Sequence, residues 1–180
     1  MPQLIVFAGL PGSGKTTLAK LLAPRLNAVL LNKDEVRAAL FAPEDVEYSD
    51  QQNDFCMDVI YQLAKYHFQQ RPERPVIIDG RTFSRKRQVD DLCSAMASSP
   101  HQLCLILCTC SLDTAKARIE KDVVQHVARD RDVSMLVRVK SQFEEIAIPH
   151  LTINTETVEL DALLSTINEF LMRKRQEPVF

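Results

Sequence analysis

Short apolar runs alternate along the whole chain with segments that carry apolar residues at helical spacing. The apolar runs are continuous, without the polar–apolar alternation of a half-exposed strand, and this is typical of parallel strands covered on both faces. From these runs we predict five strands, at residues 4–8, 28–31, 75–78, 103–108 and 150–153.

The segments between these runs are predicted to be helices. A long helix is expected after Ser49, where one apolar stripe contains Phe55, Val59, Ile60 and Leu63. Capping residues and the spacing of apolar residues predict the other helices at about 15–26, at about 33–41 and at 158–172. Two more helices are expected to start at Ser84 and at Asp113, and another is expected from Asp132 to about Ile146. This alternation indicates an α/β fold, a five-stranded parallel sheet with helices on both faces. Ligands of such sheets bind beyond the carboxyl ends of the strands, so the residues that follow each strand are the functional candidates.

Residues 9–16 read Gly-Leu-Pro-Gly-Ser-Gly-Lys-Thr, a complete G-x-x-x-x-G-K-[ST] phosphate-binding loop between the first strand and the first helix. Glycines let the backbone turn its N–H groups toward phosphate oxygens, and the helix start adds the positive end of its dipole. Lys15 is expected on the β- and γ-phosphates, and the Thr16 hydroxyl on Mg²⁺. The residues expected to contact the nucleotide are Gly9, Pro11, Gly12, Ser13, Gly14, Lys15, Thr16 and Thr17.

Asp34 and Arg37 follow the second strand, which we expect beside the strand of the phosphate loop. A carboxylate here is a candidate general base, because phosphoryl transfer to a hydroxyl needs an acceptor for the proton. Asp34 could instead be an acidic residue that favours the start of a helix. Arg37, one turn further on, favours the functional interpretation, since its guanidinium would bind an anionic acceptor or the transferring phosphate.

Asp79 closes the third apolar strand, and Arg81 follows it closely. A carboxylate at the end of a buried strand is typical of a second nucleotide motif, in which it steadies Mg²⁺ directly or through water. An ordinary turn aspartate is the alternative. Arg81 is a candidate for binding the acceptor, whereas for Arg85 and Arg87 we prefer the interpretation of solvated surface arginines.

The region of about residues 115–146 is predicted to be a helical lid. Arg118 lies on its first helix, and a charged connection at residues 129–132 precedes its second. A mobile lid that carries arginines would neutralise charge in the transition state and exclude water. An ordinary pair of charged helices is the alternative. We expect Arg129 and Arg131 to act in catalysis and Arg118 to contact the nucleotide.

Composition narrows the class of protein. The 180 residues carry a net charge of −2, so no global field favours nucleic acid or an anionic membrane. The five cysteines and four histidines lack metal-ligand spacing, and we interpret the cysteines as reduced and structural. The first strand begins close to Met1, and no apolar run approaches the roughly 20 residues of a membrane span. We therefore expect a cytoplasmic protein without a leader or a membrane segment.

Together these residues resemble a small P-loop kinase of the polynucleotide kinase, zeta toxin and adenylylsulfate kinase type. The likeness is specific in the phosphate loop, fairly specific in the pair Asp34 and Arg37, and loose elsewhere. It implies a P-loop NTPase fold in which residues 1–180 form a single kinase domain that uses ATP and Mg²⁺. It also implies that Asp34 is the general base, that Arg37 binds the transferring or acceptor phosphate, and that Arg129 or Arg131 is a lid arginine.

The activity expected from this resemblance is transfer of the γ-phosphate of Mg–ATP to a hydroxyl group. Asp34, Arg37, Asp79 and Arg81 are the expected acceptor-binding residues, and Thr16 and Asp79 the expected metal ligands. A small-molecule or nucleotide acceptor is preferred over nucleic acid, because the net acidity does not favour a long nucleic-acid footprint. The alternative is a nucleotide-dependent switch or hydrolase that acts on a protein partner. The acceptor and the oligomeric state stay open.

Overall fold

The computed structural model describes residues 1–122 and 133–176 of the chain. Five parallel strands form one sheet in the order β2-β3-β1-β4-β5. They are β1 (Gln3–Gly9), β2 (Val29–Asn32), β3 (Val76–Asp79), β4 (Gln102–Thr109) and β5 (His150–Asn154). Each strand overlaps a predicted one, so the expected five-stranded parallel sheet is confirmed.

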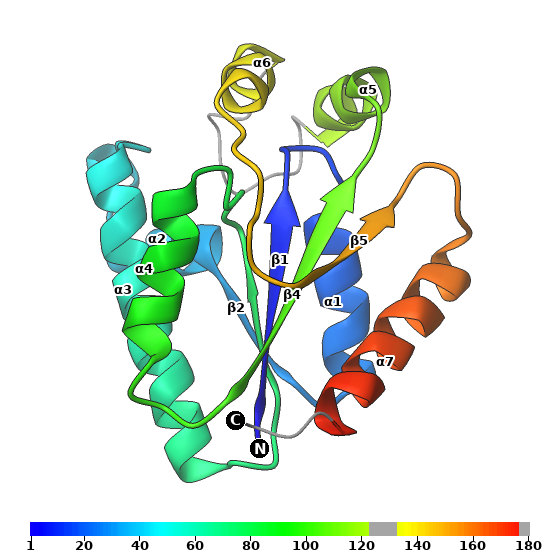
Figure 1. The fold of residues 1–180 in the computed structure, drawn as a ribbon. Helices are drawn as coiled ribbons and strands as arrows, with labels where there is room; N and C mark the ends of the chain where they lie inside the picture. The colour runs from blue at the N-terminus through cyan, green and yellow to red at the C-terminus, as the bar shows by residue number, and fades with distance from the viewer. Residues whose placement is uncertain (123–132, 177–180) are drawn as a thin grey trace.

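Helices cover both faces of this sheet (Figure 1). One face carries α1 (Lys15–Arg25) and α7 (Leu160–Gln176), and the other carries α3 (Asp50–Gln70) and α4 (Lys86–Met96). Helix α2 (Lys33–Leu40) and the 3₁₀ helix η1 (Pro43–Asp45) connect β2 to α3 along the chain. Helices α5 (Leu112–Asp122) and α6 (Val133–Ser141) lie beyond the carboxyl ends of the strands.

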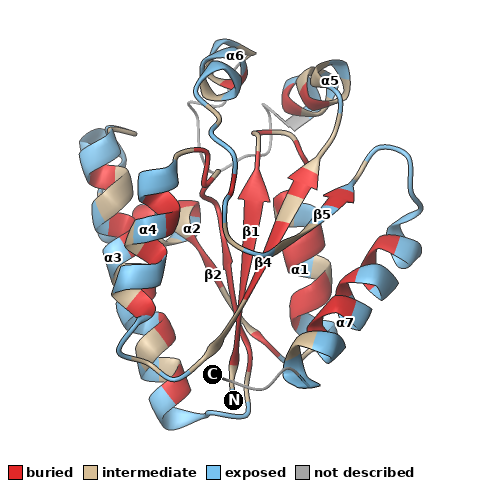
Figure 2. Cartoon of the chain, viewed as in Figure 1, coloured by how far each residue is buried: buried red, intermediate tan, exposed pale blue. Residues whose placement is uncertain are grey.

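The core consists of two apolar clusters, one on each face of the sheet. Figure 2 shows that the central strands are buried along most of their length, while the helices bury only the side that faces the sheet. Alternate residues of β1 belong to opposite clusters, Leu4 and Val6 to one, and Ile5 and Phe7 to the other. This double coverage is the physical reason for the continuous apolar runs in the sequence.

The strand beside β1 is β3, and the expectation that β2 occupies this place is wrong. All four residues of β3 are fully buried, whereas Val29 and Leu30 of the edge strand β2 are partly exposed. The strand that is buried throughout therefore takes the interior position, and the partly exposed one lies at the edge of the sheet. Because Asn32 pairs in register with Asp79, the end of β2 still lies at the edge of the sheet where β3 ends.

Several helix boundaries differ from the prediction. Helix α7 spans Leu160–Gln176, where residues 158–172 were expected. Helix α4 begins at Lys86 with Arg85 as its N-cap, one residue later than a cap at Ser84 would give. Helix α6 ends at Ser141 and does not reach Ile146. The chain after α6 leaves the helical path because the Glu144 N–H donates to the Ser84 carbonyl oxygen (2.8 Å), and Ile146 then packs into the core of the α3–α4 face.

Candidate nucleotide and acceptor site

The phosphate-binding loop is packed tightly between β4 and α5. Gly9 has a φ of +136°, and a Cβ at this position would lie 2.3 Å from the carbonyl oxygen of Cys108. Gly12 has a φ of +75°, and its Cβ would lie 2.5 Å from the carbonyl oxygen of Ala115. Neither position accepts a side chain, since it would be strained at these φ values and would overlap backbone atoms. The two glycines therefore fix the path of the loop.

Lys15 is the first residue of α1 and is only 7% exposed. Its Nζ atom donates to the carbonyl oxygens of Gly9 (2.9 Å) and Leu10 (2.7 Å), so the ammonium group lies against the loop. The N-cap of α1 is Gly14, which has no side chain to cap the helix. The first N–H groups of the helix and the Lys15 charge supply the donors and the positive charge that a phosphate group needs.

Asp79 ends β3, directly beside the strand that leads into the loop. It is fully buried, and its Oδ2 atom accepts a hydrogen bond from Asn32 Nδ2 at 2.7 Å. Among the described residues, its Oδ1 atom has no hydrogen-bond partner. A buried carboxylate oxygen that lacks a donor suits a hard cation or a water bound to one. Asp79 therefore fits the expected role at Mg²⁺, and the partly buried Thr16 at the start of α1 can supply the hydroxyl.

Asp34 and Arg37 form a buried ion pair on α2. Arg37 Nη1 donates to Asp34 Oδ1 at 2.9 Å, and the two side chains are 3% and 5% exposed. Lys33 Nζ lies 3.7 Å from the same oxygen. The helix is anchored where β2 ends, because the Asn32 side chain accepts from the Asp34 N–H (2.9 Å) and the Glu35 N–H (3.1 Å). The chain thus passes directly from β2 into α2, and this cap fixes the position of Asp34 at the start of the helix.

Two residues that sequence reasoning missed support this pair from the α3 side. Asn53 Oδ1 accepts from Lys33 Nζ at 2.7 Å and from Arg37 Nη2. The Arg37 guanidinium lies 4.9 Å from the centre of the Tyr48 ring, within the range of a cation–π contact. Tyr48 has a φ of +51°, which is uncommon for a residue other than glycine. No local pattern marks either residue, since these contacts join segments that are separate in the sequence.

One cavity of about 390 Å³ brings the loop and this pair together. Lys15 lines it from the loop, Asp34 and Arg37 from α2, and Arg81 from the segment that follows β3. The other residues that matter for its chemistry are Lys33, Tyr48, Asp50, Asn53, Arg85 and Arg138. Five of the predicted site residues line the cavity: Pro11, Lys15, Asp34, Arg37 and Arg81. The other described ones do not line it: Gly9, Gly12, Ser13, Gly14, Thr16, Thr17, Asp79 and Arg118. Arg85, which we had interpreted as a surface arginine, does line it, whereas Arg87 does not.

Arg81 is held by an ion pair with α3. Its Nη2 atom donates to Asp54 Oδ1 at 2.5 Å, and Arg87 Nη2 donates to Asp54 Oδ2 at 3.0 Å. Partial burial raises the pKa of Asp54, but the hydrogen bonds from Arg81 and Arg87 outweigh it and hold the pKa below its ordinary value of 3.8. The Asp54 carboxylate is therefore ionised at neutral pH and forms ion pairs with two guanidinium groups.

Arg118 connects the phosphate loop to the turn that follows β5. Its Nη1 atom donates to Thr155 Oγ1 (2.9 Å) and to the Gly12 carbonyl oxygen (3.3 Å), and its Nη2 atom donates to the Thr155 carbonyl oxygen (2.8 Å). Thr155 Oγ1 donates in turn to the Ser13 carbonyl oxygen at 3.0 Å. Arg118 thus contacts the loop itself and lies outside the lining of the cavity.

The two helices of the expected lid pack against each other and against the loop. Ala115 and Ile119 of α5 and Leu136 of α6 form a small buried cluster, and Leu10 of the loop packs on it. Arg129 and Arg131, the expected lid arginines, lie outside the described residues. Their roles therefore stay predictions from the sequence.

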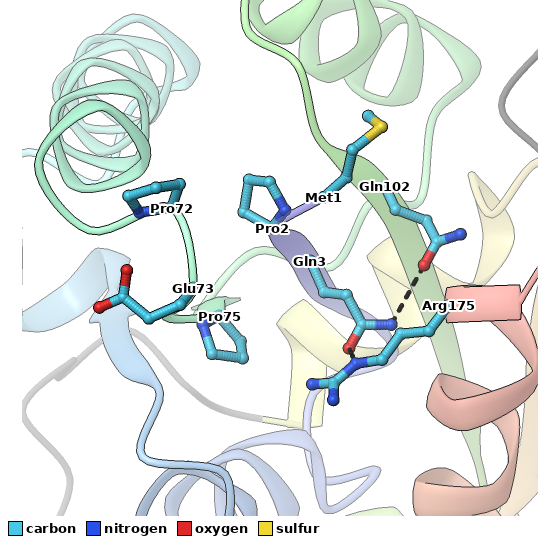
Figure 3. A pocket seen from close by; sticks show the side chains of 8 residues that line it. All are labelled: Met1, Pro2, Gln3, Pro72, Glu73, Pro75, Gln102 and Arg175. Atoms are coloured by element: carbon cyan, nitrogen blue, oxygen red, sulfur yellow. Dashed lines mark hydrogen bonds between the residues drawn. The ribbon is translucent and has the colours of Figure 1, made fainter.

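A second cavity, of about 320 Å³, lies at the amino ends of the strands, opposite the phosphate loop (Figure 3). Gln3 Oε1 accepts from Arg175 Nε at 2.9 Å, and Gln3 Nε2 donates to the Leu171 carbonyl oxygen at 2.9 Å. These contacts tie α7 to β1. Ligands of parallel sheets bind at the carboxyl ends of the strands, so the function of these contacts is structural.

Within residues 1–122 and 133–176, no group of three or more His, Cys, Asp or Glu side chains could hold a metal ion, and all five cysteines are free thiols. Burial raises the pKa of the Cys108 thiol to about 12, with Lys15 opposing this rise and Asp79 adding to it. Cys108 lies beside the phosphate loop and thus behaves as an inert core residue. A search of the described residues finds no helix that is long and apolar enough to cross a membrane.

The strand order, the glycine loop and the buried carboxylate at the end of β3 define a P-loop nucleotide-binding protein of the α/β class. The chain belongs to the AAA domain family, which matches residues 4–146. A comparison with curated proteins finds no match.

Solved structures with the same fold include several kinases. A candidate kinase from Chloroflexus aurantiacus superimposes with a TM-score of 0.73 at 24% identity, over 94% of this chain and 98% of that one. The APS kinase of Mycobacterium tuberculosis in complex with AMPPNP and APS gives 0.71 at 17% identity, over 95% and 98%. A gluconokinase from Sinorhizobium meliloti gives 0.68 at 15% identity, over 96% and 93%. The fold is therefore that of small P-loop kinases.

Proposed function

We propose that this protein is an ATP-dependent phosphotransferase that moves the γ-phosphate of Mg–ATP to a hydroxyl group of a small-molecule or nucleotide acceptor. The observation that carries the proposal is that one cavity is lined both by Lys15 of the phosphate loop and by the buried pair of Asp34 and Arg37. A nucleotide-binding loop alone would need no oriented carboxylate facing it. The kinases that share the fold support the same reaction class.

In the proposed reaction, the acceptor hydroxyl oxygen forms a bond to the γ-phosphorus, and the bond from that phosphorus to the bridging oxygen of ADP breaks. Asp34 accepts the proton of the hydroxyl group and orients its oxygen for attack. Arg37 holds the Asp34 carboxylate at 2.9 Å and adds positive charge beside the transferring group. Lys15 neutralises charge on the phosphates, and ADP leaves with the electron pair of the broken bond.

Thr16 and Asp79 are the residues that would hold Mg²⁺, Asp79 through its unpartnered Oδ1 atom or through water. When bound there, Mg²⁺ would supply positive charge that neutralises the phosphates. Asn32 keeps the other Asp79 oxygen in place through the 2.7 Å hydrogen bond. We expect Arg118 to steady the loop on its nucleotide side, and Arg129 or Arg131 to contribute in the transition state.

The test is transfer of labelled γ-phosphate from Mg–ATP to a panel of alcohols, nucleosides, nucleotides and 5′-hydroxyl oligonucleotides. Asp34→Asn should lower transfer on the order of 10²–10⁴-fold, the usual contribution of a positioned general base. Asp161→Asn is the matched control, because Asp161 forms an exposed ion pair with Arg25 far from the cavity, with 90% of its own side chain accessible.

Nucleotide binding is measured separately by calorimetric titration with ATP and with GTP. Lys15→Ala should weaken ATP binding and abolish transfer, while its circular dichroism spectrum stays that of the wild type. Slow release of free phosphate at equal rates in the wild type and in Asp34→Asn, with no labelled acceptor, would refute the kinase and favour a nucleotide-dependent hydrolase that acts on a protein partner.

A further inference from the structure

The cavity carries far more positive than negative charge. Among the described residues that line it, six are basic and two are acidic, although the whole chain has a net charge of −2. A hollow lined by one sign of charge concentrates its field and attracts ions of the opposite sign. Only Lys15 among these six belongs to the phosphate loop, so most of the positive charge faces the acceptor side.

Three of the basic residues, Arg81, Arg85 and Arg138, come from the segment after β3 and from α6. Arg81 is only 5% exposed, and its Nε atom has no hydrogen-bond partner among the described residues. A buried N–H group without an acceptor is costly for a folded protein and is therefore expected to face a ligand.

The protein's own carboxylates do not balance these arginines. Asp54 receives both Arg81 and Arg87, so one negative charge is shared by two guanidinium groups. Arg85 donates to Asp50 at 3.1 Å, but the Asp50 side chain is 67% exposed and its charge is largely screened by water. Arg85 also donates to Gln142 at 2.8 Å, which is neutral. An additional anion is needed to complete this part of the cavity.

We propose that the acceptor is a small alcohol that carries a phosphate ester besides the reacting hydroxyl, and that Arg81, Arg85 and Arg138 bind this ester. The inference rests on the proposed function, since it names the acceptor class of that reaction. A phosphate dianion matches several guanidinium groups in charge and accepts paired hydrogen bonds from their planar forks. The cavity of about 390 Å³ falls in the range of small-molecule sites, which favours a phosphorylated metabolite over a polymer.

Matched pairs of acceptors test this assignment. The panel contains glycerol and glycerol 3-phosphate, ribose and ribose 5-phosphate, gluconate and 6-phosphogluconate, adenosine and adenosine 3′-phosphate, together with a 5′-hydroxyl oligonucleotide. In at least one pair, kcat/KM for the phosphorylated member should exceed that of its neutral or carboxylate partner on the order of 100-fold, the effect of one or two charge-assisted hydrogen bonds.

Arginine variants then locate the ester. Arg85→Gln and Arg138→Gln should each raise KM for the phosphorylated acceptor about tenfold, with kcat and KM for ATP unchanged. The Arg85 and Arg138 side chains are partly or largely exposed, so we expect the fold to tolerate their replacement. Arg81 is not replaced in this test, because it is buried and its loss could destabilise the fold. Arg87→Gln is the matched control, because Arg87 shares Asp54 with Arg81 but does not line the cavity.

A binding measurement without ATP makes the test independent of catalysis. The phosphorylated member of the preferred pair should raise the Tm of the wild type and should not raise that of the double variant Arg85→Gln/Arg138→Gln. Equal use of neutral and phosphorylated alcohols, transfer to the oligonucleotide alone, or an unchanged KM in both variants would overturn the inference while leaving a kinase. Phosphate release without transfer to any alcohol would overturn the proposed function and this inference with it.

Discussion

Replacement of Arg37 by methionine should destabilise the protein strongly, because it leaves the buried carboxylate of Asp34 without its main partner. Arg37 and Asp34 are 3% and 5% exposed and 2.9 Å apart. Breaking a buried pair from one side usually costs about 3–5 kcal/mol. Lys33, at 3.7 Å from the same oxygen, retains part of the compensation. We therefore expect the lower end, about 3 kcal/mol, which for a chain of this size corresponds to a fall in Tm of about 6–12 °C.

Urea denaturation followed by circular dichroism measures this loss as a change in the free energy of unfolding. Arg25→Met is the matched control, because Arg25 forms an ion pair with Asp161 at 3.2 Å in which the side chains are 53% and 90% exposed. Such an exposed pair is worth about 1 kcal/mol or less. The double variant Asp34→Asn/Arg37→Met should be more stable than Arg37→Met alone, since it no longer buries an uncompensated charge.

Two results would refute this reasoning. If Arg37→Met cost no more than Arg25→Met, the Asp34 carboxylate would not depend on its buried partner. If the double variant were less stable than Arg37→Met, the methionine side chain and not the unpaired charge would be the cause of the loss.

Three further predictions concern the loop, Asp54 and the lid. Gly12→Ala should weaken ATP binding at least tenfold in a calorimetric titration, because the new Cβ would lie 2.5 Å from the Ala115 carbonyl oxygen at a φ of +75°; wild-type affinity would contradict the tight packing of the loop. The pKa of Asp54 is lower in the folded state than its ordinary value of 3.8, so its ion pairs stabilise the fold above that pH and stop doing so as the pH falls through the lower, folded value. Urea titrations should therefore show wild type and Asp54→Asn differing in stability at pH 6 and converging below pH 3.8; a constant difference would exclude this linkage. Arg131→Ala should lower kcat more than it raises KM for either substrate in steady-state kinetics, and a change in KM alone would assign Arg131 to ground-state binding.

The phosphate loop and the strands were predictable because their signals are local. A loop that must turn its N–H groups inward needs glycine at set places, and Gly9 and Gly12 occupy positions where any Cβ would meet backbone. Strands buried on both faces have to be apolar throughout, as the four fully buried residues of β3 illustrate. Residues that follow such strands, including Asp34 and Arg81, could therefore be assigned to one edge of the sheet.

The order of the strands and the far wall of the cavity were not predictable in this way. An apolar run does not specify which strand it pairs with, so β2 was wrongly expected beside β1. Asn53 and Tyr48 matter only because α3 brings them against α2, where Asn53 accepts from Lys33 and Arg37. Arg85 looked like a surface residue in the sequence, since nothing local distinguishes an arginine over a cavity from one in solvent.

The arrangement of carboxylates around the cavity links binding to stability. Asp34 compensates Lys33 and Arg37, and Asp54 compensates Arg81 and Arg87, so each of these carboxylates serves two cations. Surplus like charge in a confined cavity is unfavourable for the stability of the fold. The surplus is best explained by ligands that bring the missing negative charge. A phosphorylated ligand that supplies this charge should therefore raise the stability of the protein when it binds.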